Sequence, residues 1–345
     1  MSANIALMVK YRVILFLMDV ERGNPNGDPD SDNEPRQDHE TGFGLITDTS
    51  TKAKIRRMVE LLLQYGKIPN EGNAIYVRRG SILNDAIKDA YVEAGVTIEE
   101  PKKITIKGKG KKKGDDDASA TAEESEDREV EVNTEDHKRR ASAADAVKGN
   151  QRLCEKYYDF RSFGGVVTGV GSGRITGPLQ VAIGMSVEPI TSDALAVTVQ
   201  AARTKEESEK QKGQNQGMGR KHVIPYALYT QKATLNPFRA KESGYTEADF
   251  EILLEACKHM YEHERSTSRG IMTLRQIFIF EHTDPFWNAR AADLWDLIKI
   301  ERRDPSVLPR KFSDYKITVG KMPDGVTLKL GYPMPEVEQE VVAAE

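Results

Sequence analysis

Acidic side chains alternate in a loop near the N-terminus. Asp28, Asp30 and Asp32 occupy every second position, as ligands do at the start of an EF-hand calcium loop. Such a loop needs glycine at its sixth position and a bidentate glutamate at its twelfth, where this chain has Asn33 and His39. The spacing therefore argues against calcium. The asparagines and prolines of the loop instead predict turns held by side-chain hydrogen bonds.

Basic side chains gather on a helix predicted over residues 48–65. Lys52 and Arg56 are four residues apart and share one side of it, while Lys54 and Arg57 share another. Cations along a helix can follow phosphates without reading bases, so the pattern predicts a positioning contact with nucleic acid. A solvated polar face is the alternative, and the spacing alone leaves it open.

A second candidate site precedes a pair of glycines at 164–165. Arg161 and the hydroxyl of Ser162 are predicted to hold phosphate oxygens, and Phe163 is a candidate for stacking on a base. The alternative is that Phe163 belongs to the core and the glycines mark a bulge. Further candidate RNA-binding residues stand in turns, on a hairpin stem and at a helix end: Arg174, Arg220, Lys221, His222, Arg265 and Arg269.

Other kinds of chemistry find no support in the sequence. Glycines 169, 171 and 173 are spaced G-x-G-x-G and lack the third spacing of a dinucleotide-binding loop. Cys154 and Cys257 are far apart, which argues against a zinc site and a disulfide framework. No nucleophile–histidine–acid motif is present. We therefore predict no catalytic residue, no cofactor and no metal.

The hydrophobic pattern predicts an α+β fold. Asp48 is expected to cap the helix over 48–65, and Thr246 with Asp249 to form a capping box at the start of the clearest helix. Pro225 argues for an edge position or a bulge in its strand. The predicted elements are a buried central strand (11–20), a long loop (23–44), a short helix (81–95), a hairpin (159–190), strands (194–200, 220–234, 270–282) and helices (246–263, 286–300).

Charge is segregated along the 345 residues. Seven lysines lie between 102 and 113, and an acidic stretch follows from 115 to 131, so the net charge of −4 says little about the rest of the chain. We expect a mobile charged insertion over 101–136. No apolar stretch approaches the roughly 20 residues of a membrane helix, and no signal peptide is evident. A soluble, cytoplasmic protein is expected.

Four ordered motifs resemble one known family. They are the N-terminal GNPNGDPD with a TGFGLITD turn and a basic helix, then RSFGGVVTGVGSGRITGPLQ, MGRKHVIPYALY and HERSTSRGIM. Together they are similar to the type I-C CRISPR backbone proteins, the Csd-two branch of the Cas-seven family in the RAMP superfamily. The motifs are spread over most of the chain in the expected order.

The resemblance implies a ferredoxin-like (RRM-like) palm with a hairpin thumb. The palm would comprise 1–100 and 137–332, with the thumb near 200–235 and a loose tail at 333–345. Copies would line up along one CRISPR RNA beside other Cascade subunits, and the guide would pair with target DNA while the protein holds its backbone. The resemblance implies no enzyme activity and no membrane. The alternative is a metal-dependent ribonuclease of the type III backbone kind that uses a loop aspartate such as Asp28.

Overall fold

The computed structural model describes residues 9–98, 141–169, 171, 173–199, 204–210 and 217–332. The predicted charged insertion and the predicted tail lie outside these residues. The chain divides into two compact units. The larger comprises Met1–Ser81, Leu153–Gly165 and Arg174–Glu345, and the smaller comprises Ile82–Arg152 and Val166–Gly173.

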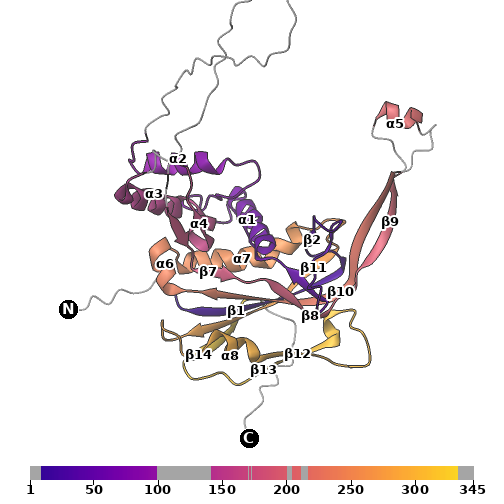
Figure 1. The fold of residues 1–345 in the computed structure, drawn as a ribbon. Helices are drawn as coiled ribbons and strands as arrows, with labels where there is room; N and C mark the ends of the chain where they lie inside the picture. Colours follow the sequence, from indigo (N-terminus) through magenta and orange to yellow (C-terminus); the bar gives the residue numbers. More distant parts are fainter. Residues whose placement is uncertain are drawn as a thin grey trace, which may run out of the picture. The chain divides into compact units, whose positions relative to one another are not determined.

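An antiparallel sheet forms the centre of the larger unit (Figure 1). Its strand order is β14-β11-β1-β10-β8-β4, and β7 and β9 also pair with β10. The predicted central strand is confirmed as β1, which lies between β10 and β11. The bounds are β1 Arg12–Gly23, β4 Phe43–Ile46, β7 Leu179–Val181, β8 Gly184–Pro189, β9 Asp193–Val199, β10 Gly217–Leu235, β11 Ile271–His282 and β14 Val326–Leu330.

Both faces of the sheet are covered, which explains why β1 is an unbroken apolar run. Ile14 and Phe16 pack on one face with helices α1 (Asp48–Gln64) and α7 (Glu247–His263). Leu15 points to the other face, where α8 (Ala291–Asp296), β12 (Ile298–Arg302) and β13 (Tyr315–Val319) pack. Successive side chains of a strand alternate between faces, so a strand buried on both sides must be apolar throughout.

The two long helices begin where side chains satisfy their first amide groups. Thr47, and not the predicted Asp48, is the N-cap of α1, and its side chain accepts a hydrogen bond from the amide of Ser50. The capping box of α7 is confirmed, because Thr246 and Asp249 each accept from the other's backbone amide.

Two predicted segments differ from the structure. Residues Tyr158–Phe163 form a short helix, α4, where strand was expected. The predicted hairpin is present only after it, as β5 (Gly164–Val166) paired with β6 (Arg174–Thr176). The predicted last helix ends at Asp296, because the next residues form β12 and pair with β13.

Strand β10 runs beyond the sheet. Its residues from Ile224 onward pair with β1, whereas Gly217–Val223 pair only with β9. The β9–β10 hairpin, called the ribbon below, therefore extends past the end of β1 (Figure 1). On its side away from β1 the strand is unpaired at Pro225, between the ladder with β9, which ends at Val223, and the ladder with β8, which begins at Tyr229, so the predicted edge position is present locally. The register with β1 is constant across this point, so the predicted alternative, a bulge, is absent, although Arg22, which faces Pro225, has a φ of 48°.

The remaining elements are short. In the smaller unit the hydroxyl of Tyr91 on α2 donates to Asn150 on α3 at 2.8 Å, and α2 confirms the predicted helix over 81–95. None of the described helices is long and apolar enough to cross a bilayer. The other bounds are β2 Gly27–Asp28, β3 Glu34–Pro35, α2 Leu83–Glu93, α3 Ala143–Lys156, α5 Lys205–Lys210, α6 Pro237–Ser243 and a 3-10 turn at Phe312–Asp314.

Candidate nucleic-acid interface

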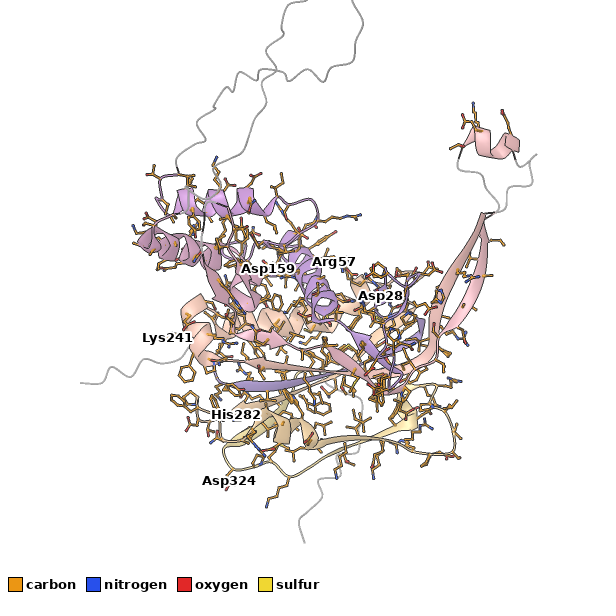
Figure 2. All side chains as sticks on the ribbon, in the orientation of Figure 1. Asp28, Arg57, Asp159, Lys241, His282 and Asp324 are labelled. Carbon is orange, nitrogen blue, oxygen red and sulfur yellow. The ribbon has the colours of Figure 1, made fainter. Side chains whose placement is uncertain are left out.

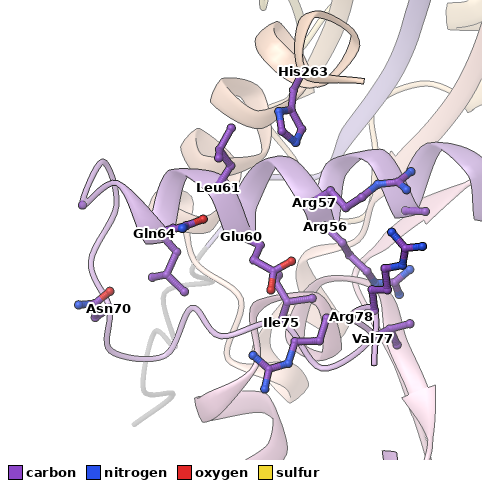
Figure 3. Close-up of a pocket in the computed structure, with 14 residues that line it drawn as sticks. Arg56, Arg57, Glu60, Leu61, Gln64, Asn70, Ile75, Val77, Arg78 and His263 are labelled. Atoms are coloured by element: carbon purple, nitrogen blue, oxygen red, sulfur yellow. The ribbon is translucent and has the colours of Figure 1, made fainter. Parts of the chain in front are cut away.

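An open groove of about 1200 Å³ runs beside α1 (Figure 3). Side chains of α1, of the loop that follows it and of the end of α7 line its walls. Four arginines face it against a single carboxylate, Glu60, so the groove suits a polyanion. The charged and apolar lining residues are Ala53, Arg56, Arg57, Glu60, Leu61, Leu63, Ile75, Val77, Arg78, Arg79 and His263.

One wall is fixed by a buried carboxylate. Asp159 on α4 accepts from the guanidinium of Arg56 at 2.7 Å. The same carboxylate accepts from the backbone amides of Tyr76 and Val77, at 2.7 and 3.1 Å. Asp159 therefore ties the loop after α1 to the helix, and it places the loop arginines opposite Arg56.

The other end of the groove carries a cluster of like charges. Glu264, whose side chain is 8% exposed, pairs with Arg57 at 2.6 Å and with Arg269. Burial lowers the pKa of Lys54 to about 7, and the charges of Arg269 and Arg57 act on it in the same direction. The carboxylate of Glu264 thus pairs with two guanidinium groups, both of which act on the pKa of Lys54, so the cluster is short of negative charge.

Two groove residues were missed by the sequence reasoning. Arg78 and Arg79 are exposed, and within the described part of the chain neither has a carboxylate partner. Burial lowers the pKa of Arg57 and the charge of Arg79 adds to this, so these two guanidinium groups lie near one another. The sequence feature that could have identified them is a pair of arginines directly before a glycine, which is typical of an exposed turn. Gly80 has a φ of 79° and turns the chain at this point.

Several predicted contact residues face the interior of the protein. Arg161 is buried and donates to Asp249 and to the carbonyl of Gly72, and the hydroxyl of Ser162 is fully buried. Phe163 is 8% exposed and lies 5.2 Å below the guanidinium of Arg56. The prediction that these side chains meet RNA directly is at odds with this burial. A β-carbon on Gly164 would lie 2.3 Å from the carbonyl of Ile175, so the glycine admits protein backbone.

Lysines 52 and 54 differ in what they can reach. Lys52 is partly exposed, pairs with Asp48 at 2.9 Å and lies above the ring of Phe163. Lys54 is 1% exposed and donates to the hydroxyl of Ser50 at 2.7 Å. Of the two, only Lys52 has surface to offer a ligand.

The cations outside the groove are distributed over three places. Arg220 and Lys221 lie on the ribbon with side chains that reach solvent, whereas the ring of His222 is buried between Asp32 and Glu34, 3.6 Å from each. Arg174 is exposed on β6, and Arg265 pairs with Glu262 at 2.5 Å on the surface. The structure does not bring these residues into the groove.

The acidic loop is held by its own hydrogen bonds. Asn24 donates to the carbonyl of Asn33 at 2.7 Å, and Asn26 accepts from the amide and hydroxyl of Thr47 at 2.8 and 2.9 Å. Asp28 accepts from the amide of Asp30. The bond of Asp28 closes a turn, as predicted, whereas Asn24 bridges the loop and Asn26 holds Thr47, the N-cap residue of α1. Among the residues that the structure describes, no group of three or more His, Cys, Asp or Glu side chains could hold a metal ion.

The loop and the segment after α7 lie against each other beside α1. The amide of Asn24 donates to the carbonyl of Ser268 at 2.9 Å. A β-carbon on Gly23 would lie 1.9 Å from the carbonyl of Arg269, and one on Gly270 would lie 2.4 Å from that of Arg22. Glycine at both positions is what allows the two backbones to cross. The fold thus brings the GNPNGDPD motif and the HERSTSRGIM motif together beside the basic helix α1.

The described chain is therefore an α+β protein with an antiparallel sheet and a cationic groove along its first helix. The family model of CRISPR-associated protein Cas7 matches residues 10–320. The chain belongs to this family.

Similarity to individual proteins is more limited. A protein of Haloferax volcanii named CRISPR-associated protein Cas7 is 38% identical over 66 residues, which are 19% of this chain and 17% of that protein. A chain of a "CRISPR RNA-guided surveillance complex, pre-nicking" aligns with a TM-score of 0.46 and 15% identity, over 83% of this chain and 81% of that one. A chain of a "CRISPR RNA-guided surveillance complex" aligns with a TM-score of 0.42 and 11% identity, over 91% and 90%.

Proposed function

We propose that this protein is a non-catalytic subunit that holds a CRISPR RNA along its groove. The observation that carries the proposal is the pair Arg78 and Arg79, which are exposed and without acidic partners in the described residues, opposite Arg56 and Arg57. Such cations neutralise phosphates without reading bases. Membership of the Cas7 family supports RNA as the polyanion.

The finer points of the proposal follow the resemblance. The protein would be a backbone subunit of a type I-C Cascade complex, with copies along one guide, other Cascade subunits beside them and target DNA paired to the guide. The connectivity supports a ferredoxin-like palm: β1, α1, β8, β10, α7 and β11 follow in sequence, and their strands lie in the order β11-β1-β10-β8. The ribbon, which spans 193–199 and 217–223, is an observation in favour of the proposed hairpin thumb.

Charge reversal in the groove tests RNA binding. Arg78→Glu with Arg79→Glu should abolish co-purification of RNA at moderate salt. It should also flatten the fall of affinity with salt concentration, by about one unit of slope for each phosphate that the variant no longer neutralises. Arg310→Glu is the matched control, because Arg310 is exposed on a loop between β12 and β13. RNA retention by the double variant at the level of the control would count against the proposal.

A metal-dependent ribonuclease that uses Asp28 is the rival function. The contacts of Asp28 argue against this function, because its carboxylate accepts from the amide of Asp30 and pairs with Arg36 at 3.3 Å. Purified complex incubated with complementary RNA and Mg²⁺ separates the two. We expect intact RNA. Regularly spaced cuts that vanish in Asp28→Ala would establish the ribonuclease instead.

A further inference from the structure

Two aromatic side chains project into solvent from the turn that follows β11. Phe286 is 65% exposed and Trp287 is 52% exposed. Trp287 has a φ of 65°, in the left-handed region that side chains larger than that of glycine rarely adopt. Strained residues of this kind persist where the surrounding structure holds them, and they cluster at ligand sites.

The turn is cross-linked by its own polar groups. The side-chain oxygen of Asn288 accepts from the amides of Thr283 and Asp284, each at 3.1 Å. The amide of Asn288 donates to the buried ring of His282 at 2.9 Å, and the amide of Trp287 donates to the carbonyl of Asp284 at 3.0 Å. The two exposed rings are therefore presented in a fixed arrangement.

These rings belong to a continuous run of aromatic contacts that begins at the surface and ends at the buried ring of His282. Phe238 on α6 lies 4.8 Å from Phe286, measured between ring centroids, and Phe286 lies 6.4 Å from Trp287. Tyr11 follows at 5.7 Å from Trp287 and His282 at 5.0 Å from Tyr11. We call these five residues the aromatic strip. Its outer rings offer free faces at the spacing over which aromatic groups stack.

Cations flank the strip. Arg239 follows Phe238 on α6 and lies close to Tyr11, where its charge opposes the rise that burial causes in the pKa of the Tyr11 hydroxyl. Arg239 and Lys241 have no ion pair within the described residues, and Lys10 is 59% exposed beside Tyr11. Exposed acids close to these residues in sequence include Glu242 and Asp284, and one carboxylate oxygen of Asp284 accepts from the amide of Phe286.

A charge network adjoins the other end of the strip. Three cations face two carboxylates in it, which leaves one positive charge in excess. Its pairs are Lys10–Glu281, Arg12–Glu281, Arg12–Glu247 and Lys329–Glu281. Glu281 and His282 are neighbours in β11, so their side chains point to opposite faces of the sheet, and the network lies at the same end of the sheet as the rings but on the α7 face.

We propose that the aromatic strip binds single-stranded nucleic acid, with bases stacked on Phe286 and Trp287 and phosphates held by Arg239 and Lys241. Exposed rings with unpaired cations beside them are the composition of single-strand platforms. Aromatic residues and arginine are enriched in protein interfaces too, but lysine is depleted there, so the exposed Lys241 favours a polyanion.

The strip is a separate site from the groove. The strip and the groove share no residue. The strip lies near Arg12, the first residue of β1, whereas the ribbon extends beyond Gly23, the last residue of β1. In Figure 2, His282 and Lys241 mark the end of the sheet that lies away from the ribbon. The proposal therefore does not depend on the function assigned to the groove.

The indole of Trp287 serves as the reporter for the test. Trp287 and Trp295 are the two tryptophans of the chain. The full chain, in the Arg78→Glu, Arg79→Glu background that disables the groove, is titrated with a 20-nucleotide oligo(dT) and separately with oligo(U). We expect saturable, salt-sensitive quenching of the indole fluorescence with at least one of them. Trp287→Phe, which keeps a ring on the same backbone, should remove the signal.

Two further variants make the test specific. Phe286→Ala and Arg239→Glu should each weaken the binding roughly 5- to 100-fold, the range expected when one base no longer stacks or one phosphate is no longer neutralised. Tyr65→Ala is the control, because Tyr65 is a 70% exposed ring at the end of α1 and outside the strip.

Three outcomes would overturn the proposal. One is the absence of quenching with either oligonucleotide in folded protein. Another is quenching that Phe286→Ala and Arg239→Glu leave unchanged. The third combines two results: the protein binds neither oligonucleotide, and the sedimentation coefficient of Trp287→Ala is lower than that of the unmodified protein. The strip would then be a contact between protein chains. If the groove variant retained RNA and so contradicted the proposed function, the effects of Phe286→Ala and Arg239→Glu on oligonucleotide binding would still test the strip.

Discussion

The carboxylate of Glu264 lies 2.6 Å from the Nε of Arg57 and also holds Arg269, so one buried acid joins the basic helix to the segment after α7. Lys54 lies in the same cluster, and both arginines act on its charge. Among the cations that line the groove, Arg57 is thus positioned by a largely buried carboxylate.

Replacing Glu264 is expected to destabilise the protein. Glu264→Gln leaves two guanidinium groups without their shared counter-charge, which should lower the free energy of unfolding by about 2–4 kcal/mol. Urea denaturation followed by circular dichroism measures the change. Glu262→Gln is the matched control, since Glu262 pairs with Arg265 at the surface and should cost less than about 1 kcal/mol. Equal losses in the two variants would contradict the assigned role of Glu264.

Lys54 should make the stability depend on pH in the neutral to alkaline range. Burial and the charges of Arg269 and Arg57 lower its pKa to about 7, whereas a lysine in an unfolded chain has a pKa of about 10.4. Above pH 7 the unfolded chain therefore holds a proton that the folded chain has released. The free energy of unfolding should rise from pH 7 to pH 9, by about 2 kcal/mol from this group.

Lys54→Met removes the titrating group and should flatten that rise. Lys52→Met provides the comparison, because Lys52 is partly exposed on the same helix and pairs with Asp48. The measurement is the urea midpoint at pH 7, 8 and 9 for the three proteins. A rise that survives in Lys54→Met would show that another group is responsible.

Glu281 should dominate the response to acid. Burial alone would raise its pKa, but hydrogen bonds from Lys329 and Arg12 outweigh this and lower the pKa to about 2. A carboxyl with a lowered pKa contributes stability above its unfolded value of about 4.3, and this is lost as the pH falls towards 2. Glu281→Gln should cost about 2–4 kcal/mol at pH 7 and weaken the dependence on acid.

Glu247 offers the control for that experiment. It pairs with Arg12 at 2.7 Å, but its side chain is 47% exposed, so Glu247→Gln should cost less than about 1 kcal/mol. Thermal melts between pH 7 and pH 3 compare the variants. If Glu247→Gln were the more damaging change, the account of the network would be wrong.

Gly23 is expected to tolerate no side chain. The β-carbon of an alanine would lie 1.9 Å from the carbonyl of Arg269, so β1 and the segment before β11 would have to separate at their crossing. We expect Gly23→Ala to cost about 2–3 kcal/mol in urea denaturation, as overpacking does. Gly219→Ala on the ribbon has its nearest neighbour at 3.9 Å and should be neutral within about 0.5 kcal/mol.

The sequence predicted the elements whose pattern is local and strong. The run at 11–20 could only be a strand buried on both faces, and the spacing of apolar residues from Phe250 to Tyr261 could only be an amphipathic helix. Helix α4 was missed because its residues read as β-rich, yet Phe160 is buried and Arg161 is satisfied inside the fold, so tertiary contacts decided its conformation.

The candidate site was harder to predict than the fold. Sequence spacing identified Arg56 and Arg57, but it could not distinguish a cation that faces solvent from one that a buried acid holds inside. Arg161 and Lys54 therefore entered the predicted set although both are buried. Arg78 and Arg79 were missed, because their importance comes from Asp159, far along the chain, which draws their loop against α1.

The continuity of β10 has a mechanical consequence. One strand of 19 residues serves both the middle of the sheet and the ribbon, so the ribbon behaves as a cantilever built into the core and not as an arm on a hinge. A force on its tip is carried directly into the ladder with β1. The strand has its least lateral support at Pro225, because neither β8 nor β9 pairs with it there.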